Sequence, residues 1–241
     1  MSTELHTITV GGLRIDVVRK PIKNLHMGVY PPNGRVWVAA PVRVSDDAVR
    51  LAVVSRMGWI KRQQAKFEAQ ARQSQRAYVS GESHFFLGRR YRLNVIPHDG
   101  APRVSLRNST TLDLRVRESS ETVEREKALQ SWYRRELKGI APPLIEKWAQ
   151  SVQIPAPQWG IKRMKTKWGS CNIEARRIWL NLELIKKPHH CLEYVIVHEM
   201  IHFRERHHND RFVALMDNLL PRWTYIREEL NAEPLGHENW P

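Results

Sequence analysis

The sequence predicts an α+β fold, in which a β-rich N-terminal region with one helix is followed by a mainly helical region with a short antiparallel sheet. In the first half, short alternating apolar runs lie between turns that contain glycine or proline, a pattern typical of strands. In the second half, apolar residues recur at helical spacing over longer segments. The polar stretch Arg117–Thr122 separates the two patterns, so we expect a division into residues 1–120 and 121–241.

The N-terminal region is expected to begin with a hairpin, because two alternating runs within residues 8–17 flank Gly11-Gly12. A strand over 36–39 follows a turn-like segment that contains Pro, Asn and Gly. Ser45 is placed to cap a helix that continues past Trp59. Four further strands are predicted over residues 85–87, 91–95, 104–106 and 112–116.

The C-terminal region is expected to open with a long helix that is interrupted or bent near Pro142-Pro143. Its apolar positions are Leu129, Trp132, Tyr133, Leu137, Ile140, Leu144, Ile145 and Trp148. A hairpin is then predicted, with strands over 160–166 and 177–184. Another helix is expected after Pro188. Its run Tyr194–Val197 alone favours a strand, but the length of the segment and its histidine spacing favour a buried helix.

The charge of the chain predicts polyanionic partners. There are 39 Lys and Arg against 25 Asp and Glu, which gives a net charge of +14. Such a balance attracts nucleic acids, nucleotides or acidic proteins over long distances, although no known nucleic-acid-binding motif is present. Only Cys171 and Cys191 occur, no apolar run is long enough to cross a membrane, and the N-terminus does not resemble a secretory signal. We therefore expect a cytoplasmic protein that makes no use of a membrane.

The most informative motif is His198-Glu199-Met200-Ile201-His202. Residues four apart lie on the same face of a helix, so His198 and His202 can present two imidazoles to one metal ion. Glu199 lies beside them, where it can reach a water on that ion without being a ligand. This HExxH spacing is typical of a hydrolytic Zn²⁺ site with the glutamate as general base.

A catalytic zinc ion usually has three protein ligands, and His208 is the favoured third. On an unbroken helix His208 would point away from the other two, so the helix must end between residues 203 and 207. The sequence downstream supports such an end, since Asn209 or Asp210 can cap a new helix that continues to Pro221. A helix that starts there requires the earlier one to have ended just before it. His207 is the close rival as third ligand, and the next candidates are the carboxylates of Glu228 and Glu229.

An isolated pair of histidines four residues apart is more often a chance feature of a helix surface. In this chain, however, six of the eleven histidines fall between residues 189 and 208, and a glutamate lies within the motif. His189 and His190 at the helix start are read as ordinary polar residues. The clustering therefore favours a metal site, which makes 121–241 the expected zinc-dependent catalytic domain.

The chain resembles the YgjP-like metallopeptidases, which are related to the SprT-type zinc proteins. The resemblance is carried by Arg163–Cys171, Ile178–Asn181 and Tyr194–His202, and it continues with His208 and Phe212. It implies a zincin-like catalytic region, zinc ligands His198, His202 and His208, and Glu199 as base. His207 and Asn209 flank the third histidine where the family often has Asn and Ser, and Val213 replaces a frequent Trp. Within Trp168–Cys171 the side chains are expected either to pack or to line the cleft.

Three functions fit these patterns. The first is a zinc-dependent peptidase, in which a strand such as Arg177–Leu184 holds an extended peptide or protein substrate. The second is a metal-dependent nucleotide pyrophosphohydrolase, in which Arg163, Lys165 and Lys167 clamp phosphates. The third is a nucleic-acid-associated protease whose N-terminal region docks on the nucleic acid. A nucleophilic role for Cys171 is not expected, because no partner base is evident.

Overall fold

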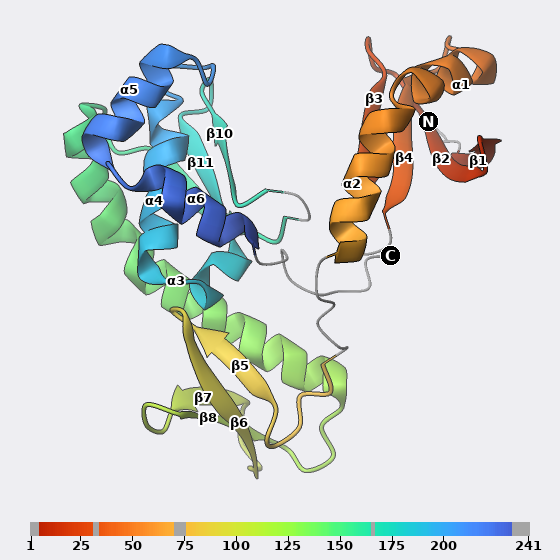
Figure 1. Cartoon of the computed structure of the whole chain (residues 1–241). Coiled ribbons are helices and arrows are strands. Elements are labelled where there is room, and N and C mark those ends of the chain that lie inside the picture. The colour runs from red at the N-terminus through yellow and green to blue at the C-terminus, as the bar shows by residue number, and fades with distance from the viewer. Residues whose placement is uncertain (1–4, 31–33, 70–75, 165–166, 233–241) are drawn as a thin grey trace. The chain divides into compact units, whose positions relative to one another are not determined.

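The computed structural model describes residues 5–30, 34–69, 76–164 and 167–232. It confirms the predicted α+β class, with three small sheets and six α-helices in the described part of the chain (Figure 1). The chain divides into two compact units, one within residues 1–74 and the other within 75–235.

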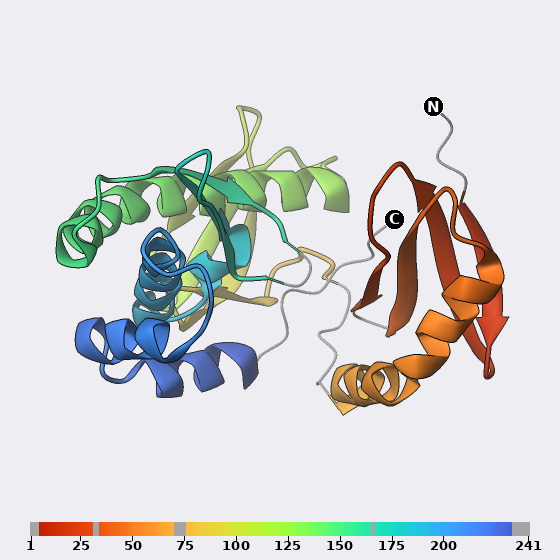
Figure 2. The ribbon, with the colours of Figure 1, turned by 90° about the horizontal axis from the view of Figure 1, so that it is seen from above.

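The first unit is a four-stranded sheet whose strands are arranged in the order β1-β2-β4-β3. Its elements are β1 (Leu5–Val10), β2 (Leu13–Lys20), β3 (His26–Tyr30), β4 (Arg35–Pro41), α1 (Asp46–Ser55) and α2 (Met57–Ala69). The two helices lie along one face of the sheet (Figure 2). Ile15 and Val38 from the sheet and Val53 from α1 are fully buried in the shared core.

Most local predictions for this unit are confirmed. The hairpin forms around Gly11-Gly12, where both glycines have positive φ. The Ser45 side chain caps α1 by accepting a hydrogen bond from the Ala48 amide. Two features were not predicted: strand β3, and the division of the helix into α1 and α2 at Arg56. Strand β3 has a weak strand pattern of its own and forms as the antiparallel partner of β4.

The second unit begins with another four-stranded sheet, ordered β5-β6-β8-β7. Its strands are β5 (Ser83–Phe86), β6 (Arg89–Pro97), β7 (Arg103–Leu106) and β8 (Thr111–Val116). Strand order and pairing directions are the same as in the first unit: an antiparallel pair, a central parallel pair and a second antiparallel pair. All four strands were predicted from their alternating residues.

Helix α3 (Thr122–Val152) packs on one face of this second sheet (Figure 1). Trp132 and Leu137 are buried in a core shared with Leu93 and Leu114, and the Tyr133 hydroxyl donates to the Phe85 carbonyl at 2.8 Å. The helix continues through Pro142-Pro143 without interruption. The division predicted at 117–122 falls between β8 and α3, inside the second unit, because the sheet and α3 share one core.

The third sheet differs from the predicted hairpin. Its order is β10-β11-β9, with β9 (Gln158–Lys162), β10 (Gly169–Asn172) and β11 (Arg177–Asn181). The antiparallel partner of β11 is β10, whereas β9 runs parallel to β11, so the sheet is mixed. Residues 182–184, predicted to continue the strand, instead begin a 3₁₀ helix over Leu182–Lys186.

Three helices complete the second unit: α4 (His189–Ile201), α5 (Asp210–Leu219) and α6 (Trp223–Ala232). Helix α4 is central, since it packs against α3, α5 and α6 and against the third sheet. Among the described residues, no helix is both long and apolar enough to cross a membrane.

Candidate metal centre

Helix α4 carries the first two histidines, and it begins directly after Pro188 as predicted. The residues of Tyr194–Val197, which favour a strand by themselves, are all buried. Neighbours on several sides therefore cover the helix, and burial of these apolar side chains outweighs their local strand preference. His198 and His202 lie one turn apart and are the partly exposed positions near the end of the helix.

The chain turns sharply after α4, in the interval where the sequence predicted a break. The amides of Arg204 and Glu205 both donate to the Ile201 carbonyl at 2.8 Å, which closes the helix. Four residues later, the Asn209 side chain accepts a hydrogen bond from the Phe212 amide at 3.0 Å and caps α5. His208 immediately precedes this cap, so the start of α5 determines the position from which its side chain returns to α4.

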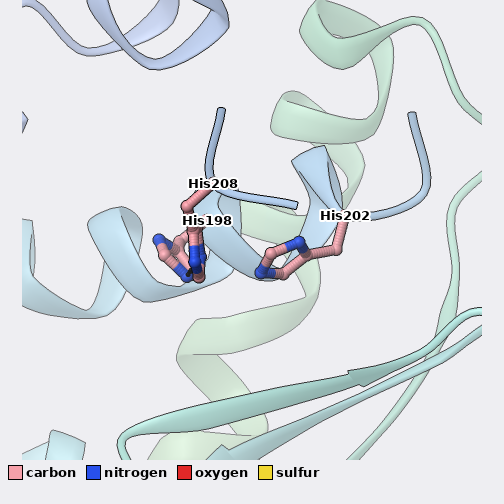
Figure 3. Close-up of side chains that lie close together, drawn as sticks. All are labelled: His198, His202 and His208. Atoms are coloured by element: carbon pink, nitrogen blue, oxygen red, sulfur yellow. Dashed lines mark hydrogen bonds between the residues drawn. The ribbon is translucent and has the colours of Figure 1, made fainter. Parts of the chain in front are cut away.

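The three imidazoles converge on one point (Figure 3). Ligand atoms of His198, His202 and His208 lie within 4.8 Å of one another, a spacing that could hold a metal ion. Nε2 of His208 is 3.1 Å from Nε2 of His198. The Phe212 ring packs against all three, with centroid distances of 4.6 to 5.0 Å. This ring keeps one side of the cluster apolar and limits the rotamers of the imidazoles.

The donor set fits a borderline-soft divalent cation such as Zn²⁺. The Nδ1–H of His202 donates to the Glu205 carbonyl at 3.2 Å, so its Nε2 keeps a lone pair for a metal. Burial lowers the pKa of His198 to about 3 and also lowers that of His202, which keeps both rings neutral at physiological pH. Nδ1 of His198 is buried and lacks a hydrogen-bond partner among the described residues. Neutral, incompletely paired imidazoles are good ligands.

Glu199 lies beside the histidines in a mostly apolar setting. Its side chain is 7% exposed. Burial raises the pKa of its carboxyl to about 7, an effect that the positive charge of Lys167 partly opposes. Gly169 of strand β10 packs directly on this carboxylate: a Cβ at Gly169 would lie 2.7 Å from Oε1 of Glu199 and 2.7 Å from Cγ1 of Val195. The strand approaches closely because residue 169 has no side chain.

An open pocket of about 790 Å³ contains the whole cluster. One part of its lining is the segment Lys167–Glu174, which includes strand β10. The remaining lining residues are Tyr194, Val195, His198, Glu199, His202, Arg206, His208, Leu230 and Asn231. The segment Trp168–Cys171 thus lines the cleft, and its packing and lining roles coexist.

The rival third ligands lie elsewhere. His207 is exposed and is not part of the cluster of three. Glu229 contacts Nε2 of His190 at 2.6 Å, and Glu228 is exposed. The geometry therefore favours His208. His190, interpreted from the sequence as an ordinary polar residue, forms a hydrogen bond with Glu229 of α6.

Other residues singled out from the sequence have structural roles. Asn181 is fully buried, and its side-chain amide donates to the carbonyls of Met164 and Lys167 at 2.8 Å, which fixes the loop before β10. Arg163 pairs with Glu126 at 3.8 Å, and Lys165 lies outside the described residues. Burial, with the nearby charge of Glu199, raises the pKa of Cys171 to about 11, so its thiol stays protonated.

Tyr194 and Arg206 line the pocket, but the sequence analysis assigned neither a functional role. Tyr194 precedes His198 by four positions, a spacing that places both on one face of α4, and their ring centroids are 5.8 Å apart. Helical spacing could therefore have identified Tyr194. No local pattern indicated Arg206, which lies in the turn after α4.

These features define a candidate site for a metal ion: three imidazoles that could hold the ion, an adjacent buried carboxylate and an open pocket. Residues 25–233 match the family described as "YgjP-like, metallopeptidase domain". Because the match spans most of its length, the chain belongs to this family.

Two solved structures are similar to part of the chain. One is the metallopeptidase zymogen jannalysin of Methanocaldococcus jannaschii, with 23% identity and a TM-score of 0.34 over 37% of this chain and 91% of that one. The other is the zymogen abylysin of Pyrococcus abyssi, with 17% identity and a TM-score of 0.35 over 36% of this chain and 89% of that one. Comparison with curated proteins gave no match.

Proposed function

We propose that the chain is a zinc-dependent peptidase, with His198, His202 and His208 as the zinc ligands and Glu199 as the general base. The observation that supports this most directly is the convergence of three imidazoles next to a buried carboxylate in one pocket. Membership of a metallopeptidase-domain family agrees with this chemistry.

In this mechanism a zinc ion, when bound, supplies Lewis-acid activation of water and of the scissile carbonyl. Glu199 accepts a proton from the water and later delivers it to the leaving amine. A carboxyl whose pKa lies near 7 is suited to both transfers, because it gains and loses a proton with little cost at neutral pH. Burial raises the pKa of Tyr194 to about 12, so its hydroxyl keeps its proton and can donate to a developing oxyanion.

Strand β10 is the element suited to hold the substrate. Strand β11, favoured from the sequence, has neighbours on both edges, whereas β10 is an edge strand that lines the pocket. An extended peptide can pair with the free edge of β10 through backbone hydrogen bonds, which places its scissile bond near Glu199.

Glu199→Gln tests the mechanism. Removal of the general base should lower kcat by at least about a hundredfold, since general acid–base catalysis contributes roughly 10² to 10⁴. Zinc content, measured by mass spectrometry, should stay near one ion per chain. His208→Ala is the complementary variant and should lose zinc and activity together. Wild-type peptide cleavage by Glu199→Gln would exclude this role, and full zinc retention by His208→Ala would exclude the third ligand.

Lys167 and Arg206 in the pocket favour a second candidate, hydrolysis of a nucleotide phosphoanhydride. Both cations could contact phosphates. A site of three histidines, however, suits zinc better than the Mg²⁺ or Mn²⁺ that usually accompanies phosphate chemistry. The two candidates separate when zinc-loaded protein is assayed in parallel for peptide cleavage and for release of phosphate or pyrophosphate from nucleoside triphosphates.

A further inference from the structure

The sheet of β5 to β8 has one face on the protein core and one open face within its unit. Leu93, Leu112 and Leu114 point inward and are at most 1% exposed. Because side chains alternate along a strand, their neighbours point to the other side. Five of the residues on that side are arginines, which together we call the arginine face: Arg90, Arg92, Arg103, Arg107 and Arg115.

The arginine face is almost free of negative charge. Asp113 is the one acidic residue at the outward positions of these four strands, and it is only 2% exposed. Arg107 and Arg115 donate to it at 3.1 and 3.2 Å, and Asn94 donates at 2.9 Å, so donors surround the carboxylate. The charge that the face presents to solvent is therefore positive.

Three of these arginines have no structural partner. Arg90, Arg92 and Arg103 are exposed, and their side chains make no hydrogen bond or ion pair with any other residue that the structure describes. Solvated surfaces usually intersperse both signs of charge, because like charges placed close together repel. A group of unpaired guanidinium ions on a rigid sheet is instead complementary in charge to a polyanion.

We propose that the arginine face binds the phosphate backbone of a nucleic acid without reading its sequence. Planar guanidinium groups contact phosphate oxygens in pairs. Arg90 and Arg92 lie two residues apart on one strand, roughly 6.7 Å, so that neighbouring phosphates can be contacted together. The net charge of +14 increases the rate of encounter. This role does not depend on the peptidase chemistry, because the face lacks every residue of the metal centre.

The test compares two triple variants with the same change in net charge. The first is Arg90→Gln, Arg92→Gln and Arg103→Gln. The control is Arg43→Gln, Arg56→Gln and Arg62→Gln, which removes three exposed arginines from the first unit. Binding of a fluorescein-labelled single-stranded 20-mer and of the same sequence as a duplex is measured by anisotropy from about 20 to 200 mM salt.

Wild type should bind both probes, with affinity that falls steeply as salt rises. The first variant should reduce the slope of log affinity against log salt by about two for the single strand and by nearly three for the duplex. The control should change the slope little, and both variants should keep the wild-type melting temperature. No binding at 20 mM salt, or equal losses in the two variants, would overturn the proposal. So would equal competition by polyglutamate, or a preference for anionic phosphatidylserine vesicles, since these indicate another class of partner.

Discussion

At the scale of single residues, Glu199 is held in a setting that disfavours its charge. Strand β10 covers the carboxylate, and burial raises its pKa. A pKa shifted in this way is expected for a group that must exchange a proton during catalysis. The spacing of the motif predicted which residue would be the base, but the cause of its raised pKa was invisible in the sequence, because Gly169 lies thirty positions away.

The raised pKa of Glu199 predicts how stability depends on pH without metal. In the folded protein the pKa is about 7, above its ordinary value of 4.5. The folded state therefore holds the proton more tightly, and this contribution to stability is lost as pH rises from 4.5 through 7. In Glu199→Gln it is absent. The free energy of unfolding of the variant relative to wild type should rise by roughly 3 kcal/mol across this window.

Chemical denaturation of EDTA-treated wild type and Glu199→Gln at pH 4.5, 6 and 8 measures this difference. His198, whose lowered pKa acts in the opposite direction, is common to both proteins and largely cancels. A constant difference across the three pH values would show that Glu199 titrates normally.

Gly169→Ala should impair catalysis while zinc remains bound. The new Cβ would collide with the Glu199 side chain and with Val195, so the carboxylate must move. A displacement of about 1 Å can cost roughly a hundredfold in rate. We expect kcat to fall by that order while zinc content stays unchanged.

Gly139→Ala is the matched control for this substitution, because a Cβ at Gly139 of α3 meets no atom within 4 Å among the described residues. It should leave kcat unchanged and increase stability by up to about 1 kcal/mol, as expected for alanine in a helix. Full activity of Gly169→Ala would refute the claim that this glycine positions the base.

At the scale of elements, the sequence predicted correctly those helix ends that are determined by residues within one turn of them. The start of α4, its end before residue 207 and the Asn209 cap are all confirmed, because Pro188 and a side-chain cap act within one turn. The predicted hairpin between the segments of β9 and β11 was wrong, because the two strands pair in parallel. A parallel pairing depends on packing between segments that are distant in the sequence. Strand β3 was missed because its own strand pattern is weak, and it forms as the antiparallel partner of β4.

The Asn209 cap of α5 should influence metal affinity from outside the ligand set. Asn209→Ala removes the acceptor for the Phe212 amide and should cost about 1 kcal/mol of stability. Because His208 precedes the cap directly, its position should loosen and zinc affinity should fall roughly tenfold, the lower end expected for residues that support ligands. Asn209→Asp keeps an acceptor and should bind zinc as wild type does. Competition for zinc with a chromogenic chelator measures the zinc affinity of both variants. Equal affinities of Asn209→Ala and Asn209→Asp would contradict a role of the cap in positioning His208.

At the scale of the whole molecule, two separate apolar cores account for the two units. Buried residues of the first sheet and its helices form one cluster, and those of the second and third sheets with α3 to α6 form another. The sequence could not place this division, because both four-stranded sheets have the same alternating pattern. The packing of α3 on this sheet, together with the backbone hydrogen bonds that Leu87 and Gly88 donate to Ile185 and Lys186, assigns the sheet to the unit with the candidate metal site.

Separate cores predict that zinc stabilises one unit and not the other. All three proposed ligands lie in the second unit, so zinc at about one hundred times its dissociation constant should add close to 2.7 kcal/mol to the stability of that unit alone. Differential scanning calorimetry should resolve two transitions, of which only one moves to higher temperature with zinc. In His202→Ala, which lacks one of the proposed ligands, zinc should shift neither of the two transitions. If both transitions move together with zinc, the two units unfold as one, and the metal centre then stabilises the N-terminal sheet as well as its own core.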